Sequence, residues 1–135
     1  APLGALTAYP SHAFNAAAKG LPFTFPVSPE TGMSTLFLDD VIRSLEAFAT
    51  ADRAGLKHHA YNLHAFTFTA AELADKIREI WPEAALDFAP NPQIDALISG
   101  WPNRVDDAAA REDWGWQPAY DFDGCVAALH KLVTG

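Results

Sequence analysis

Apolar residues along this chain recur at two spacings, one typical of amphipathic helices and one typical of short buried strands. The helical period predicts a helix between Pro10 and Gly20, and further helices over residues 39–50, 69–81, 107–113 and 121–133. Short apolar or alternating runs predict strands over residues 22–27, 35–38, 59–63, 66–69 and 86–88. The apolar residues between positions 94 and 98 fit either a helical turn or a buried extended segment.

Residues that stabilise helix ends flank most of these segments. Thr69-Ala70-Ala71-Glu72 is a capping box, in which the threonine and glutamate side chains bond each other's backbone N–H groups. Pro10 suits the first turn of its helix, and Gly20 suits the position just beyond the end. Aspartates are predicted to cap or open three further helices: Asp39–Asp40, Asp106–Asp107 and Asp121.

Helices and short strands alternate along the whole chain, which indicates an α/β fold. The length of 135 residues fits one domain with one core, and the hydrophobic share of 50% is that of a globular protein. A sheet fragment of this size leaves an edge and a face that another structure should cover.

Composition narrows the class of partner. The formal net charge of −8 argues against a nucleic-acid binder, which needs a basic surface. The single cysteine, Cys125, excludes an internal disulfide and favours a reducing compartment. Neither a bilayer-length apolar run nor a signal-peptide pattern is found, so we expect a cytoplasmic protein without membrane contact. The chain begins with Ala1 rather than methionine, which suggests processing or a piece of a longer protein.

One ordered set of motifs resembles a known family. Its members carry a tryptophan–proline loop, a paired-aspartate helix start and an Asp-Trp-Gly-Trp run, found here as Trp101-Pro102, Asp106-Asp107 and Asp113–Trp116. The likeness extends back through residues 61–63, 68–74 and 36–40. The chain thus resembles the C-terminal part of the short-chain type of L-threonine 3-dehydrogenase. That family belongs to the extended short-chain dehydrogenases, the NAD-dependent epimerase/dehydratase superfamily.

The resemblance implies an NAD-dependent oxidoreductase with a Rossmann-like doubly wound sheet and a small substrate-binding lobe. The family's glycine-rich phosphate turn is absent from this sequence, and so is its tyrosine followed four residues later by lysine. Four residues after Tyr9, Tyr61 and Tyr120 stand Ala13, Ala65 and Gly124. Residues 1–135 are therefore expected to form a single partial domain without catalytic residues. NAD would be bound mainly by a missing N-terminal cofactor domain, and the chain alone would be inactive.

The family's functional residues that have a counterpart in this sequence are those that contact the substrate. By resemblance, Thr7 matches a substrate-contacting threonine, and Trp101 matches the tryptophan of a loop that closes over the small-molecule substrate. Arg104 has no family counterpart, but its guanidinium suits bidentate pairing with a substrate carboxylate. A metal site is not expected, because the histidines lack ligand spacing.

Alternatives stay open at this stage. Trp101 could equally be a structural residue that fills a turn, and Arg104 could form an ordinary surface ion pair. Trp114 and Trp116 are more typical of the core than of a site. The substrate could instead be a sugar acid or a nucleotide sugar, within the same superfamily. A non-catalytic binding or assembly module is the third hypothesis, and the sequence leaves a homo-oligomer open.

Overall fold

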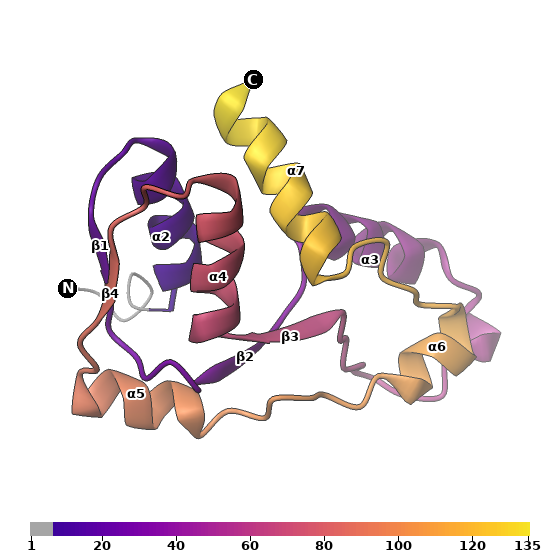
Figure 1. The fold of residues 1–135 in the computed structure, drawn as a ribbon. Helices are drawn as coiled ribbons and strands as arrows, with labels where there is room; N and C mark the ends of the chain where they lie inside the picture. The colour runs from indigo at the N-terminus through magenta and orange to yellow at the C-terminus, as the bar shows by residue number, and fades with distance from the viewer. Residues whose placement is uncertain (1–6) are drawn as a thin grey trace.

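The computed structural model describes residues 7–135 as an α/β fold with a packed lobe and an arm that extends to one side (Figure 1). The helices are α2 (Tyr9–Ala18), α3 (Leu38–Thr50), the 3₁₀ helix η1 (Arg53–Gly55), α4 (Ala70–Ile80), α5 (Pro92–Ser99), α6 (Ala108–Trp114) and α7 (Phe122–Thr134). The strands are β1 (Phe23–Phe25), β2 (Gly32–Thr35), β3 (Phe66–Thr69) and β4 (Leu86–Phe88).

Two strand pairs flank the core of the lobe. β1 runs parallel to β4, with Phe23 opposite Leu86, whereas β2 runs antiparallel to β3, with Gly32 opposite Thr69. Helices α2 and α4 pack side by side between them (Figure 1). Their inward side chains supply eight of the eighteen residues of the buried core, among them Phe14 of α2.

The predicted signals at the ends of α2, α4 and α7 are confirmed. Pro10 lies in the first turn of α2, and Gly20 adopts a φ of 66°, a left-handed value that glycine takes without steric cost. The capping box forms at α4: the Thr69 hydroxyl accepts from the Glu72 N–H at 3.1 Å, and the Glu72 carboxylate accepts from the Thr69 N–H at 2.7 Å. Asp121 caps α7 by accepting from the Gly124 N–H at 2.8 Å.

The strand predicted over residues 35–38 lies too late in the chain. β2 ends at Thr35, because its partner β3 begins opposite it at Phe66, and residues beyond Thr35 have no strand to pair with. Asp39 and Asp40 do lie in the first turn of α3, but their predicted capping role is wrong, since no side chain caps this helix.

The strand predicted over residues 59–63 is not formed in the described part of the chain. The segment has an irregular backbone and belongs to neither strand pair. A strand requires a neighbour to receive its peptide hydrogen bonds, and residues 7–135 supply none here.

Residues 92–99, which the sequence left undecided, form helix α5. The Asn91 side chain caps it by accepting from the N–H groups of Gln93 and Ile94 at 3.0 and 3.3 Å. Helix α6 is preceded by Asp106, whose carboxylate accepts from the Ala108 N–H at 3.0 Å.

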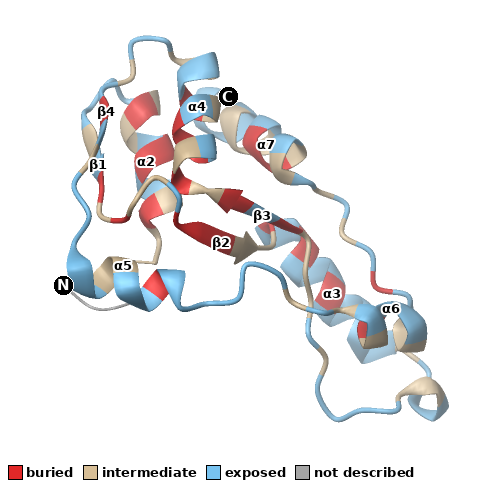
Figure 2. Cartoon of the chain, turned by 60° about the horizontal axis from the view of Figure 1, so that its bottom comes forward, coloured by how far each residue is buried: buried red, intermediate tan, exposed pale blue. Residues whose placement is uncertain are grey.

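Helix α3 turns much of its apolar side away from the lobe, and Figure 2 shows the arm that it forms with α6 as largely exposed. Apolar side chains at helical spacing are solvent-exposed along it: Leu38, Val41, Ile42, Leu45 and Phe48. The residues of α3 classed as buried are instead polar, Asp40 and Ser44. Across residues 7–135, no helix combines the length and the apolar character that crossing a membrane requires.

Replacing Thr69 with alanine tests whether the capping box holds α4. The change removes the acceptor of the Glu72 N–H, so we expect the free energy of unfolding to fall by about 1 kcal/mol in urea denaturation. Thr50→Ala is the matched control, because that hydroxyl donates only to carbonyls of its own helix, those of Glu46 and Ala47, at an exposed helix end. The control should change the free energy by less than about 0.5 kcal/mol, and equal losses in the two variants would contradict the assignment.

Candidate functional site

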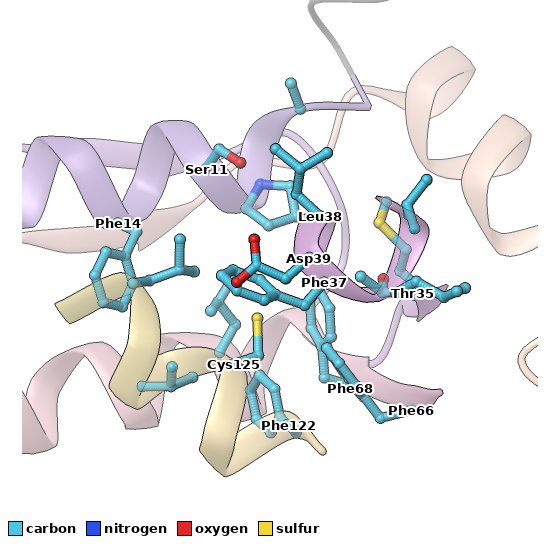
Figure 3. Close-up of a pocket in the computed structure, with 18 of the residues that line it drawn as sticks. Ser11, Phe14, Thr35, Phe37, Leu38, Asp39, Phe66, Phe68, Phe122 and Cys125 are labelled. Atoms are coloured by element: carbon cyan, nitrogen blue, oxygen red, sulfur yellow. The ribbon is translucent and has the colours of Figure 1, made fainter. Parts of the chain in front are cut away.

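A cleft of about 500 Å³ opens between α2, the chain that links β2 to α3, and α7 (Figure 3). Its walls are mainly apolar, and β3 supplies two phenylalanines to the floor. Representative lining residues, one or two from each element, are Phe14, Phe37, Phe66, Phe68, Phe122 and Val126. A concave apolar site of this size is typical of small-molecule binding.

A few polar groups interrupt the apolar lining. Thr7, Ser11, Thr35 and Asp39 all line the cleft. The Thr35 hydroxyl is buried and has no hydrogen-bond partner within residues 7–135, which is uncommon for a buried polar group. The sequence analysis missed Ser11, Thr35 and Asp39, because nothing in their local pattern shows that α2 and the β2–α3 link face one another.

Cys125 also lines the cleft, but its thiol is expected to be unreactive. Burial, with the nearby Asp40 carboxylate as the smaller cause, raises the pKa of the thiol to about 11. The thiolate is the reactive form of cysteine, so a thiol with this pKa is not a nucleophile near neutral pH.

The cleft walls are held by Asp40, which is fully buried. Its carboxylate accepts from the Ala119 N–H at 2.9 and 3.1 Å and from the Tyr120 N–H at 3.1 Å, and Arg43 pairs with it at 2.8 Å. These bonds join the first turn of α3 to the segment that enters α7, so both sides of the cleft depend on them.

The Trp101–Arg104 segment follows α5 and does not line the cleft. Trp101 is 41% exposed, and Arg104 is exposed as well. The Asn103 carbonyl accepts from the Thr67 hydroxyl of β3, and the Asn103 side chain packs against Gly32 of β2. Of the three residues predicted to contact substrate, Thr7 therefore lies at the cleft, while Trp101 and Arg104 lie within two residues of Asn103, which contacts both strands of the β2–β3 pair. Their roles stay predictions.

Helix α5, which positions Trp101, is fixed by a carboxylate that the sequence analysis missed. Asp95 accepts from the Ser28 N–H at 2.8 Å and from the Thr31 hydroxyl at 2.6 Å. The Ser28 hydroxyl is a further donor, and it is the main cause that holds the pKa of Asp95 below its usual value.

The end of the Trp101 segment is anchored through Asp107. Its carboxylate accepts from the Trp116 indole at 3.1 Å and from Arg111 at 3.0 Å, and the arginine bond is the main cause of its lowered pKa. Trp116 is buried, which confirms its predicted core position, and Trp114 packs beside it with ring centroids 6.0 Å apart.

The described residues do not fit the pyrophosphate of a dinucleotide. Such a group binds at a helix N-terminus whose N–H groups are free, and it avoids negative charge. The three helices that follow strands, α3, α4 and α5, each carry a carboxylate in the first turn. These are Asp39 and Asp40, Glu72, and Asp95.

One serine and histidine meet outside the cleft. The Ser34 hydroxyl lies 2.8 Å from the His64 Nδ1. Within residues 7–135, no carboxylate bonds to that imidazole, and no three His, Cys, Asp or Glu side chains gather to hold a metal ion.

Comparison with known proteins identifies the relatives of the chain, although no protein-family model matches it. It is 33% identical over 133 residues to the mitochondrial L-threonine 3-dehydrogenase of Bos taurus, covering 98% of this chain and 34% of that protein. It is 30% identical over 121 residues to an uncharacterized epimerase/dehydratase of Staphylococcus haemolyticus, covering 89% of this chain and 38% of the relative. The chain thus spans between a third and two fifths of the length of these relatives.

Comparison with solved structures identifies the same kind of relative. The chain superposes on the apo GalE-like L-threonine dehydrogenase from Cupriavidus necator with a TM-score of 0.90 and 31% identity. That match covers 98% of this chain and 48% of the other. The chain is a homologue of L-threonine 3-dehydrogenases and epimerase/dehydratase proteins, which confirms the resemblance identified in the sequence and the α/β, Rossmann-like fold class.

Replacing Asp40 with alanine tests the joint that holds the cleft walls. The change removes a buried carboxylate that accepts from two peptide N–H groups and pairs with Arg43, so the free energy of unfolding should fall by about 3 kcal/mol. Asp39→Ala removes the neighbouring carboxylate, which is exposed and accepts a long bond of 3.4 Å from the Tyr120 hydroxyl, and should cost less than about 1 kcal/mol in the same urea titration. Similar costs for both variants would show that Asp40 does not hold the walls.

The raised pKa of Cys125 predicts that its thiol reacts slowly with thiol reagents. In the unfolded chain the thiol has a pKa near 9, so at pH 8 the folded chain, with a pKa of about 11, should react with a disulfide reagent at least about 100-fold more slowly. The folded-state rate should rise roughly tenfold for each pH unit between 8 and 10, as the thiolate fraction grows. Equal rates for folded and urea-unfolded chains would be the contrary result.

Proposed function

We propose that this chain is the substrate-binding part of an NAD-dependent oxidoreductase similar to L-threonine 3-dehydrogenase, and that it forms a single partial domain. In this reaction a hydride leaves a hydroxyl-bearing carbon of the substrate for NAD. The observation that carries the proposal is the similarity to L-threonine dehydrogenases over 98% of the chain, in sequence and in fold.

The geometry supports a substrate role for the cleft. Its apolar walls would exclude water from the reacting carbon, and a dry site strengthens each polar contact within it. The Thr7 and Thr35 hydroxyls at the cleft are suited to hydrogen-bond the polar groups of a small hydroxylated substrate.

Trp101 and Arg104 do not line the cleft, and their proposed substrate contacts rest on the sequence resemblance for Trp101 and on guanidinium chemistry for Arg104. Their segment is tied to β2 and β3 through Asn103, and the indole and guanidinium remain exposed. An exposed tryptophan on an anchored segment can cover a ligand held by a facing surface, and an exposed arginine can pair with its carboxylate.

The cofactor side belongs to other polypeptide in this proposal. NAD, when bound, would accept the hydride, but the first-turn carboxylates of α3, α4 and α5 disfavour its pyrophosphate here. A cofactor-binding domain, joined to this chain or separate from it, would supply the phosphate turn and the proton acceptor.

A second candidate function has one specific observation behind it. The similarity to the Staphylococcus haemolyticus epimerase/dehydratase is nearly as high as that to the threonine enzymes. A different substrate on the same chemistry, such as a sugar acid or a nucleotide sugar, is therefore the alternative. A non-catalytic assembly module has no comparable support.

Supplying a cofactor domain tests the proposal. We would join the part of the Cupriavidus necator L-threonine dehydrogenase that has no counterpart here to the start of the full 135-residue chain. The fusion should form NADH from NAD and L-threonine, followed at 340 nm, and the chain alone should not. Thr7→Ala should raise KM by about tenfold, the size of one lost hydrogen bond to substrate.

Ser99→Ala is the control, since the Ser99 hydroxyl donates only to the Ala96 carbonyl of its own helix, at 3.4 Å. Erythronate and a UDP-sugar, supplied in place of threonine, separate the two candidate substrates. Turnover by the isolated chain, or a folded fusion that is silent with all three substrates, would refute the proposal.

A further inference from the structure

The arm that α3 and α6 form (Figure 2) carries a second hollow, of about 510 Å³. It is lined from α3 by Arg43, Glu46, Ala47 and Thr50, and from the end of α6 and the turn beyond it by residues 114–117. None of these residues lines the cleft beside α2, so the hollow is a separate candidate site.

The turn after α6 gives the hollow an aromatic side. Gly115 ends the helix with a φ of 74°, a left-handed value, and Trp114 and Trp116 flank it in the chain. Trp116 is buried and its indole donates to the Asp107 carboxylate at 3.1 Å, while Trp114 is half-buried beside it. This side of the hollow is therefore held in place before any ligand arrives.

The α3 side carries two opposite charges one helical turn apart. The Arg43 side chain is 53% exposed, and of its nitrogens only Nη1 has a partner, the Asp40 carboxylate at 2.8 Å. Within residues 7–135, the Glu46 carboxylate forms neither a hydrogen bond nor an ion pair, and it does not pair with Arg43. The hollow thus presents free guanidinium donors beside a free carboxylate.

Gln117 adds a neutral polar group to the lining. Its side chain is exposed, and its carboxamide has no hydrogen-bond partner within the described residues. A carboxamide both donates and accepts, so it can bond either a carboxylate or an ammonium group of a ligand. Polar groups that gather at one hollow and lack partners in the protein are typical of a site for a small polar molecule.

The charges select the class of ligand. An anion alone would face Glu46 and an arginine that Asp40 already balances, whereas an organic cation alone would be repelled by Arg43. A zwitterion avoids both penalties, because its carboxylate can bond the guanidinium while its ammonium bonds the glutamate. Side chains three residues apart on a helix begin about 5–6 Å apart, a span that a ligand with both charges on one carbon can bridge.

We propose that this hollow binds a free α-amino acid, with the carboxylate on Arg43, the ammonium on Glu46 and the carbon chain against Trp114. The end of a peptide carries only one of the two charges on its terminal carbon, so the free amino acid is the ligand that uses both. The site is additional to the substrate cleft, and it does not depend on the proposed function.

Titration of the ¹⁵N-labelled chain with glycine, followed by NMR, tests the proposal, because glycine carries both charges and no side chain. The Gly115 and Gln117 amides and the Trp114 indole should shift in a saturable way, with a dissociation constant of roughly 1 mM, modest for so small a ligand. The amides of β3 should not shift, since none of its residues lines the hollow. The titration needs neither NAD nor a second polypeptide, so its result is separate from that of the fusion.

Acetate and methylamine, which each carry one of the two charges of glycine, separate the classes of ligand. Each should bind at least about tenfold more weakly than glycine, because each leaves one charged contact unmade. Glu46→Gln should weaken glycine binding by a similar factor, since it removes the acceptor of the ammonium.

Glu83→Gln is the matched control. Glu83 is an exposed carboxylate in the turn after α4, without a partner in the described part of the chain. Its replacement should leave the dissociation constant within about twofold. Both glutamate changes should leave the β3 amide signals in place, which shows that the fold is retained.

Four results would overturn the proposal. One is the lack of a saturable shift up to about 50 mM glycine. Another is equal weakening of glycine binding in the two glutamate variants. A third is acetate or methylamine that binds as tightly as glycine, which would assign the hollow to a lone anion or a lone cation. The last is a set of shifts confined to cleft residues such as Phe37, which would place glycine there instead.

Discussion

A single buried carboxylate, that of Asp40, determines how the two parts of this molecule meet. It has no exposed surface and accepts hydrogen bonds from the N–H groups of Ala119 and Tyr120, two residues far from it in sequence. A buried charge is stable only when hydrogen bonds replace the water it has lost, so this geometry leaves little freedom. The first turn of α3 is thereby fixed against the segment that enters α7, and elements on both sides of this joint line the cleft.

The molecule contrasts a well-buried lobe with an arm whose apolar residues face solvent. In the lobe, α2 and α4 cover both strand pairs, and the core is continuous. In the arm, α3 buries polar groups and exposes leucines, the reverse of an ordinary surface helix. An amphipathic helix in this orientation is stabilised by its polar clamp while its apolar face remains available for another layer.

The charges disfavour a dinucleotide at the helix ends of the described residues. Carboxylates occupy the first turns of α3, α4 and α5. There they neutralise the positive ends of the helices and repel a phosphate that would bind at the same place. The cleft itself offers hydroxyls and aromatic walls, which suit a small polar molecule that must be kept from water. This division of chemistry agrees with relatives that are two to three times longer than the part matched here.

Sequence alone determined the features that depend on a few neighbouring residues, and tertiary structure decided those that require a distant partner. The capping box at Thr69, the first-turn proline of α2 and the cap at Asp121 were predictable, because each bond closes within one helical turn. The end of β2 was not, since it is set by where β3 begins, and segment 59–63 has a strand's sequence without a strand's neighbour. The role of Asp40 was also decided by tertiary structure. Its local pattern matched a helix cap, but its hydrogen-bond partners are the N–H groups of Ala119 and Tyr120. No local pattern reveals a contact between residues so far apart in sequence.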